Sequence, residues 1–312
     1  MKLLHIFAIL FTLHILAGCC KEDNSKCLPR HNVALLFSLP DSTGNETFAR
    51  HISAVDVMVY DASGIYVQTI HVDKNALDRF QGVQLILPAG IYYLICWGNA
   101  FDNTRYNSIE TPSISTVTYA AINGGNTAGQ SDSLYYSGTI ATRATGGLPE
   151  ACVVTVPEKG EWQGTAIFRP ACHQLEVYVK GYNENGNTLP HVKLNGLPAG
   201  LCLSDMAPLP DRTTVGSSSP TQTVTVLGQK YAAAKFRTFR LEPDSPVTIH
   251  ITSPVTGETI FSVPLSKVME QQSMKPYTIV ICVVIEFKST GVTVAIPNWN
   301  SDDIGFGFGW DY

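Results

Sequence analysis

Short apolar runs that end in turn residues recur along this chain, and they limit its possible folds more than any other feature. Within 55–60, Val alternates with Asp, Met and Tyr, and after a turn at 61–64 a second run covers 65–70. A period of two places alternate side chains on opposite faces of a strand, whereas a helix needs a period near 3.6. The pattern therefore predicts a β-hairpin.

Further runs in the first half have the same character. Residues 33–37 are continuously apolar, as in a strand that is covered on both faces. Residues 83–87 and 91–99 are joined by Pro88-Ala89-Gly90, a corner in which proline restricts φ and glycine permits positive φ. We expect two antiparallel core strands on either side of this corner. Residues 103–147 are rich in Ser, Thr, Gly and Asn, which predicts long loops.

The second half repeats this organisation. Its predicted strands cover 166–168, 175–180, 192–194, 236–241, 247–251 and 277–287. The last should be the longest and central to its sheet, because both of its faces are apolar. One or two helical turns are expected at 73–80, and residues 265–272 have helical spacing over about two turns.

Many short strands with almost no sustained helix predict an all-β fold of two tandem sandwiches. The polar gap before Ala166 favours a boundary near Gly160. We expect a signal peptide at 1–18, a flexible stalk at 19–31, an N-terminal β-sandwich at 32–160 and a C-terminal β-sandwich at 161–312. With 312 residues, the chain is long enough for two domains of ordinary size.

The amino-terminal leader predicts export. Lys2 precedes a mostly apolar run at 3–17, which is shorter than the roughly 20 residues that a membrane-spanning helix needs. The sequence Leu16-Ala17-Gly18-Cys19 resembles the bacterial lipobox, which implies that Cys19 carries lipid and begins the mature chain. The alternative is an ordinary secreted protein that is cleaved near Ala17.

Residues 20–23 read Cys-Lys-Glu-Asp and resemble a lysine-plus-two-acids signal that sends lipoproteins to the outside of the outer membrane. They could equally be a solvated spacer. The net charge of −5 and the lack of clustered Lys and Arg exclude a nucleic-acid partner.

The cysteines do not predict a metal site or a regular disulfide framework. Seven remain besides Cys19, and no Cys-x-x-Cys pair occurs. Cys96 and Cys282 fall in apolar strand-like runs, where cysteine usually acts as a small buried hydrophobe.

Catalytic motifs are missing from the sequence, and we expect neither enzyme activity nor a cofactor. There is no Gly-x-Ser-x-Gly elbow, no His-Glu-x-x-His and no phosphate-binding loop. His173 and His250 lie in strand-like stretches and are interpreted as structural. Asp302 and Asp303 provide too few oxygens for calcium, which takes six or more, and fit an exposed loop better.

Several motifs resemble the fimbrillin-A associated anchor family, lipoproteins at the base of type V pili. In the first half these are 55–61 with Gly64, 87–92, and Trp97-Gly98-Asn99. In the second half they are 168–171 before 175–179, and 292–299. The resemblance implies two transthyretin-like sandwiches and a surface-exposed, lipid-anchored protein of the outer membrane that holds a fimbrial polymer through contacts with pilin subunits.

The family also raises a question about the first strand. In type V pilins an arginine-specific protease removes that strand and opens a groove that the neighbouring subunit fills. Here Arg30 precedes and Arg50 follows the candidate first strand. We expect the strand to be retained, as in an anchor, so that Cys19 remains the amino terminus.

Aromatic residues occupy every second position at the carboxyl end. A strand would place Phe306, Phe308, Trp310 and Tyr312 on one face and mostly glycines on the other. This segment could pair with an edge of its own second domain, or it could bind a pilin subunit by strand addition. We take these four residues as the candidate partner-binding element.

The alternative function is that of a surface glycan-binding lipoprotein. In that case exposed aromatics such as Tyr135, Tyr136 and Trp162 would stack on sugar rings. Packing in the core is the competing interpretation of these residues.

Overall fold

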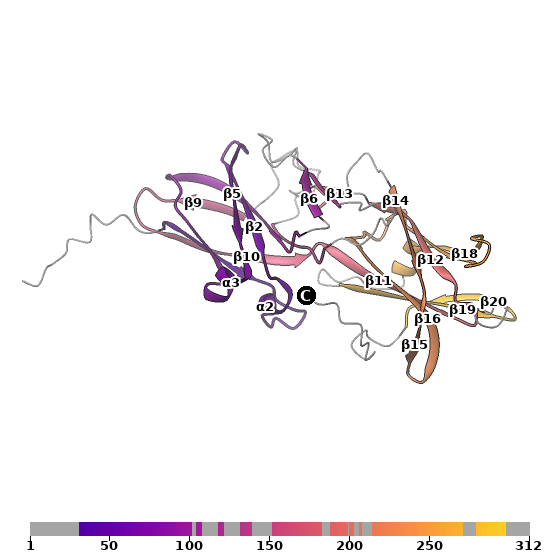
Figure 1. Ribbon diagram of the computed structural model, residues 1–312. Helices are drawn as coiled ribbons and strands as arrows, with labels where there is room; N and C mark the ends of the chain where they lie inside the picture. Colours follow the sequence, from indigo (N-terminus) through magenta and orange to yellow (C-terminus); the bar gives the residue numbers. More distant parts are fainter. Residues whose placement is uncertain are drawn as a thin grey trace, which may run out of the picture.

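Strands dominate the structure, a computed structural model (Figure 1). It describes residues 31–101, 104–107, 118–121, 132–138, 152–182, 188–198, 200–202, 206–207, 214–270 and 279–297. The three helices in these ranges have at most six residues each. The predicted all-β class is therefore confirmed. Nowhere in the described ranges is a helix long and apolar enough to cross a bilayer.

The first half forms an eight-stranded sheet in the order β3-β2-β5-β8-β10-β1-β4, with β9 paired to β5. Its strands are β1 (Val33–Ser38), β2 (Val55–Asp61), β3 (Tyr66–Val72), β4 (Gly82–Leu85), β5 (Gly90–Gly98), β8 (Tyr135–Ser137), β9 (Cys152–Val156) and β10 (Trp162–Pro170). Strands β2 and β3 are antiparallel, so the predicted hairpin is confirmed.

Two short helices border this sheet. Helix α2 (Phe48–His51) follows β1, and α3 (Lys74–Arg79) follows β3 within the predicted segment. The side chain of Asp73 caps α3 by accepting a hydrogen bond from the Ala76 amide at 2.8 Å.

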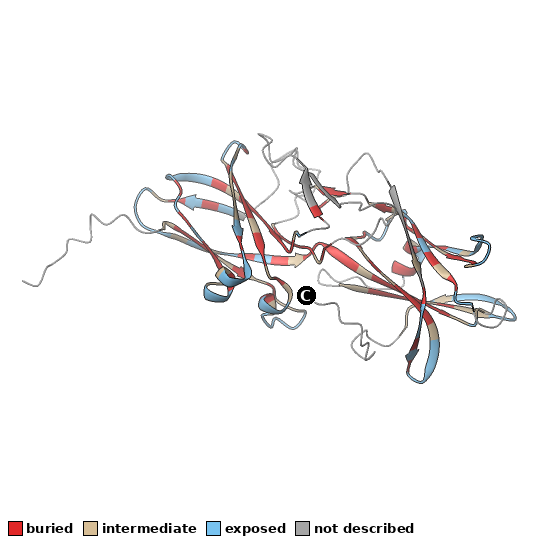
Figure 2. Ribbon diagram, in the orientation of Figure 1, coloured by how far each residue is buried: buried red, intermediate tan, exposed pale blue. Residues whose placement is uncertain are grey.

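The sheet folds into two layers that enclose a core. Strand β10 connects these layers, because it pairs with β1 in one and with β8 in the other. Residues Trp162–Ile167 pair with β1 in parallel, and the last three residues pair with β8. Apolar side chains of β1, β2 and β5 meet in the enclosed cluster, where Phe37 and Phe168 contact edge to face with ring centroids 5.5 Å apart. Figure 2 shows this buried interior in red.

The corner Pro88-Ala89-Gly90 does not join a hairpin, which corrects the sequence-based prediction. Strand β4 pairs with β1, whereas β5 pairs with β2, β8 and β9. The corner therefore carries the chain from one layer to the other. Both strands are apolar because they face the same core from opposite sides, and an apolar pattern does not specify the neighbouring strand.

The predicted boundary at residue 160 falls one strand too early. Strand β10 lies beyond that boundary, but it pairs within the first sheet, and Phe168 is buried in the first core. A single residue, Ala171, separates β10 from β11 (Cys172–Lys180), which belongs to the second half. The chain passes between the halves along one nearly continuous extended segment, visible in Figure 1.

The second half encloses its own core between a five-stranded and a four-stranded sheet. The first has the order β15-β16-β11-β19-β20 and the second β14-β12-β17-β18. The remaining bounds are β12 (His191–Pro198), β14 (Thr214–Pro220), β15 (Gln222–Val226), β16 (Gln229–Phe239), β17 (Thr248–Thr252), β18 (Thr259–Pro264), β19 (Val280–Lys288) and β20 (Gly291–Ala295). Their inward side chains form a second apolar cluster that includes α4 (Leu265–Met269), a helix that the sequence predicts.

The prediction for 277–287 is correct in one respect and wrong in another. Strand β19 lies inside its sheet between β11 and β20, as expected. It is not the longest strand, because β16 has 11 residues and β19 has 9.

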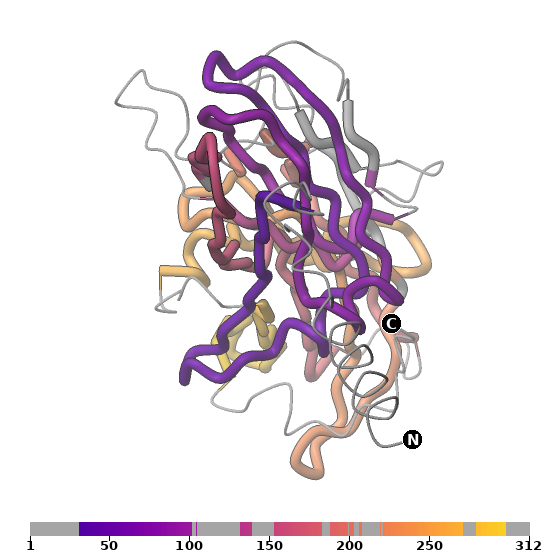
Figure 3. The backbone as a smooth tube through the Cα atoms, turned by 90° about the vertical axis from the view of Figure 1, so that its left-hand side faces the viewer, coloured from indigo at the N-terminus to yellow at the C-terminus, as the bar shows by residue number. Residues whose placement is uncertain are grey.

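A shared apolar cluster joins the two halves. Met58, Trp97 and Tyr136 of the first half pack there with Leu201 and Phe239 of the second. Beside it, β6 (Thr104–Asn107), β7 (Thr118–Ala121) and β13 (Gly200–Cys202) form a small sheet from both halves, so the expected loop region contains short strands. Figure 3, viewed along the long axis, shows the first half in front of the second.

Candidate functional site

The site residues predicted first lie outside the described part of the chain. These are Cys19, the proposed lipid site, and Phe306, Phe308, Trp310 and Tyr312 at the carboxyl end. Arg30 and the pair Asp302 and Asp303 also lie outside it. Their assignments remain predictions.

Two of the three aromatic residues predicted to stack on sugar rings are core residues. Tyr135 and Tyr136 are 5% and 0% exposed, and the Tyr136 ring lies 5.0 Å from that of Trp97. Trp162 is half-buried against the first core. Because stacking requires an open ring face, the prediction that Tyr135 and Tyr136 stack on sugar rings is wrong.

The two histidines that the sequence marked as structural have structural hydrogen bonds. His173 is fully buried, and its Nδ1 accepts a hydrogen bond from the Leu241 amide at 3.0 Å. His250 Nδ1 lies 2.7 Å from the hydroxyl of Ser262, and its Nε2 lies 3.1 Å from the amide nitrogen of Asn195. Cys96 and Cys282 are buried in β5 and β19, as predicted for small hydrophobes.

Arg50 lies in an exposed but well-anchored turn, helix α2. Phe48 and Ile52 on either side are 1% and 2% exposed. The Ile52 amide donates to the Phe48 carbonyl at 2.9 Å, and the Phe48 ring stacks on Phe37. A protease binds its substrate in an extended form, so cleavage after Arg50 requires this turn to unfold.

Glu46 fixes the start of the same turn. Its carboxylate accepts hydrogen bonds from the amides of Leu39 and Phe48 and from the hydroxyl of Ser38. Burial alone would raise the pKa of Glu46, but these hydrogen bonds to its ionised form lower it below 4.5. The end of β1 and the start of α2 are thereby held together.

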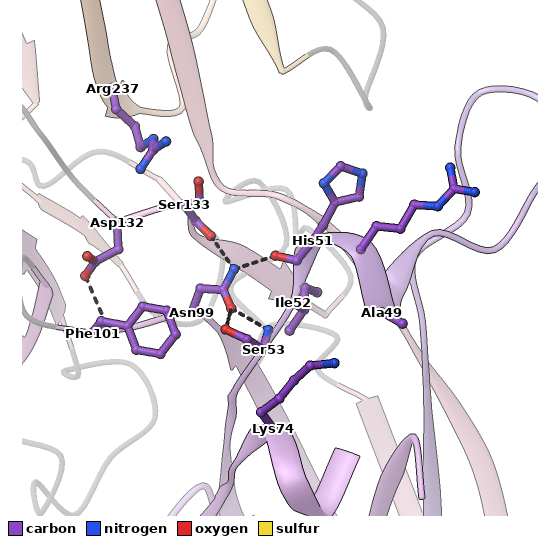
Figure 4. A pocket seen from close by; sticks show the side chains of 11 residues that line it. Ala49, His51, Ile52, Ser53, Lys74, Asn99, Phe101, Asp132, Ser133 and Arg237 are labelled. Carbon is purple, nitrogen blue, oxygen red and sulfur yellow. Dashed lines mark hydrogen bonds between the residues drawn. The ribbon is translucent and has the colours of Figure 1, made fainter. Parts of the chain in front are cut away.

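Asn99, the residue directly after β5, holds the end of the same turn through its side chain. Its side-chain amide donates to the carbonyls of His51 at 2.6 Å and Ser133 at 3.1 Å, and its oxygen accepts from the Ser53 amide at 2.8 Å. Asn99 is buried and has a φ of 60°, a conformation that Asn tolerates better than most residues. We call these three bonds the Asn99 clasp (Figure 4).

A pocket with a volume of about 410 Å³ lies beside the clasp, at the contact between the two halves. Charged and aromatic side chains from several elements line it: Arg50, His51, Lys74, Phe101, Asp132 and Arg237. Burial, together with the neighbouring charge of Arg50, lowers the pKa of His51 below 6.5, so this ring is mostly neutral at pH 7.

Sequence reasoning missed the clasp and the pocket. Positions 50, 99 and 237 are far apart in the chain, and no spacing rule connects them. The position of Asn99, directly after a strand and a glycine, was a signal for a special backbone conformation.

The chain is similar in fold to several solved structures. A candidate adhesin from Bacteroides ovatus matches with a TM-score of 0.68 and 15% identity, covering 88% of this chain and 95% of that chain. A candidate polysaccharide-binding protein from Bacteroides thetaiotaomicron matches with a TM-score of 0.67 and 13% identity, covering 87% and 99%. The fimbrial anchor protein Mfa2 from Porphyromonas gingivalis matches with a TM-score of 0.60 and 18% identity, covering 86% and 97%.

Sequence comparison identifies the lineage. No curated protein matches the chain directly. The family model of the fimbrillin-A associated anchor proteins Mfa1 and Mfa2, however, matches residues 23–305. This match covers well over half of the chain, and the chain therefore belongs to the family of fimbrillin-A associated anchor proteins.

Proposed function

We propose that this protein is a surface lipoprotein of the outer membrane that holds a fimbrial polymer as its anchor or accessory subunit. Family membership supports the fimbrial role, and the sequence Leu16-Ala17-Gly18-Cys19 supports attachment through lipid at Cys19. The activity is binding rather than catalysis, which agrees with a family of anchor proteins.

The observation that carries the anchor role is the position of β1. This strand pairs in parallel with β10 on one side and antiparallel with β4 on the other. Val33 and Leu35 are 0% exposed and Phe37 is 2% exposed. Loss of β1 would open the first core, as it does in a cleaved pilin, but here the clasp and Glu46 protect the turn in which cleavage after Arg50 would occur. These features support an anchor that retains its first strand.

The pilin-binding element in this proposal is the aromatic carboxyl-terminal segment. Strand addition to a partner would bury Phe306, Phe308, Trp310 and Tyr312 in its groove. Each ring contributes about 150–250 Å² of buried area, so the segment binds firmly only where a groove covers most of the four rings.

Shearing of whole cells tests the proposed role. An anchor stays with the outer membrane when the fimbriae are broken off, whereas a shaft or tip subunit leaves with the filaments. We expect the lipidated protein in the membrane fraction of sheared cells, with Cys19 at its amino terminus. Recovery of the protein in the sheared filaments, with a terminus at His51, would contradict the proposal.

A further inference from the structure

The pocket between the two halves has an excess of positive charge. Arg50 comes from α2, Lys74 from the start of α3, and Arg237 from β16 in the second half. The carboxylate of Asp132 is the negative group among the described lining residues, and it accepts a hydrogen bond from the Phe101 amide at 3.0 Å. Lys74 also has an ion pair with Asp78 at 2.6 Å, but Asp78 does not line the pocket.

Several backbone polar groups at this pocket are already used. The carbonyls of His51 and Ser133 accept hydrogen bonds from Asn99, the Ser53 amide donates to Asn99, and the Phe101 amide donates to Asp132. A peptide is recognised largely through backbone hydrogen bonds. This pocket instead offers side chains, so a ligand that is itself rich in hydroxyl and carboxylate groups fits it better.

The aromatic side chain in the pocket is accessible. Phe101 is 48% exposed and lies directly beside Asp132 (Figure 4). An open aromatic ring next to fixed polar groups is well suited to the apolar C–H face of a sugar ring. A volume of about 410 Å³ also lies in the usual range for small-molecule pockets.

We propose that this pocket binds a carboxylated sugar residue, such as a uronic acid unit of a surface or host polysaccharide. Arg237 binds the carboxylate, because a guanidinium group matches its geometry. Phe101 supports the ring, and the hydroxyl of Ser133 and the carboxylate of Asp132 bind its hydroxyls. This site goes beyond the anchor role, and it would give the anchor a ligand of its own.

Binding of simple sugars to the full-length lipoprotein in detergent tests the proposal. We would titrate glucuronic acid, galacturonic acid, glucose, galactose and acetate by isothermal titration calorimetry at low salt. The uronic acids should bind about tenfold more tightly than the neutral sugars, and added salt should reduce this preference. Acetate should bind more weakly than either uronic acid because it lacks the ring.

Two variants separate the proposed contributions. Arg237→Gln should remove most of the preference for the acid, whereas Phe101→Ala should weaken all the sugars about fivefold or more. Matched controls are Lys230→Gln, on the same strand as Arg237, and Leu227→Ala, an exposed apolar residue outside the pocket. Neither control should change the affinities.

Three results would overturn the proposal. Equal affinities for glucuronic acid and glucose would show that the positive charge of the pocket does not contribute to binding. Acetate as potent as glucuronic acid would reveal a general anion site, and an acidic peptide that binds more tightly than any of the sugars would reveal a protein partner. If the pocket binds none of the uronic acids, the shearing experiment can still give its expected result. The anchor role is therefore tested independently of this pocket.

Discussion

The carboxylate of Glu176 lies 2.8 Å from the ammonium group of Lys235, on directly opposed positions of β11 and β16. Glu176 is 1% exposed, and it also accepts hydrogen bonds from Gln174 and Tyr178. Burial acts to raise the pKa of Glu176, but the hydrogen bonds from Lys235 and Tyr178 outweigh burial and lower it below 4.5. The second half therefore contains a buried negative charge whose stability depends on its partners.

Removal of Lys235 should destabilise the protein. Lys235→Met leaves the buried carboxylate without its cation, which costs about 3 kcal/mol in the free energy of unfolding. Combining it with Glu176→Gln should recover part of this loss, because no unpaired charge remains. Urea unfolding at pH 7 measures both values. A Lys235→Met protein as stable as the parent would show that the pair contributes nothing.

The same pair predicts a pH dependence with a definite sign. Because the pKa of Glu176 is depressed on folding, its stabilisation is present above about pH 4.5 and is lost as the pH falls through the folded-state value. The stability difference between the parent and Glu176→Gln should therefore be constant from pH 7 to about pH 4.5 and shrink as the pH falls further. A difference that stays constant well below pH 4.5 would contradict the assignment.

Asn99→Ala should loosen the turn that contains Arg50. The variant loses the three bonds of the clasp, each worth about 1 kcal/mol, and forces alanine into a positive φ that costs a further 1–2 kcal/mol. We expect faster cleavage after Arg50 by an arginine-specific protease, seen as a new amino terminus at His51.

Two further variants make the protease experiment specific. Asn99→Gly tolerates the positive φ, and so isolates the loss of the hydrogen bonds. Asn99→Ala combined with Arg50→Gln should resist cleavage at this position while it remains equally destabilised. Unchanged cleavage of Asn99→Ala would show that the clasp does not protect the turn.

Cys19→Ser tests the lipid anchor. The variant should no longer incorporate a labelled fatty acid, and the protein should leave the outer membrane, because acyl chains are the proposed source of its membrane affinity. Metabolic labelling and fractionation measure the two effects. Continued labelling would disprove lipidation at Cys19.

Deletion of 305–312 tests the proposed pilin-binding element. If the segment serves a partner, the melting temperature of the protein should change little, while attachment of the fimbriae is lost. Thermal unfolding and counts of attached filaments give the two readouts. A large fall in melting temperature would instead place the aromatic segment in the protein's own core.

Local structure was predictable where neighbouring residues determine it. The hairpin of β2 and β3 follows from alternating apolar residues and the turn before Ile65, and α3 lies within the short helical segment predicted at 73–80. These features depend on contacts between residues close in the chain, the farthest being Val55 with Val72. The alternation of apolar and polar residues along a strand is a local property that can be read directly from the sequence.

Strand partners were not predictable in the same way. Trp162–Pro170 has the alternation of a strand, but nothing in that pattern says that it pairs with β1, more than 120 residues earlier. The pocket escaped prediction for the same reason, because Arg50 and Arg237 meet only after both halves have folded.

The parallel pairing of β1 with β10 has a mechanical consequence. The pairing runs from Val33 opposite Trp162 to Ser38 opposite Ile167. In the proposed anchor, the membrane pulls on the chain ahead of Val33, and the second half pulls on β10 at its opposite end, Pro170. Tension is thus applied along both strands from opposite ends, and the hydrogen bonds between them share the load instead of breaking one by one. The pairing that closes the first core would also be a shear-resistant link between a lipid tether and a filament in flow.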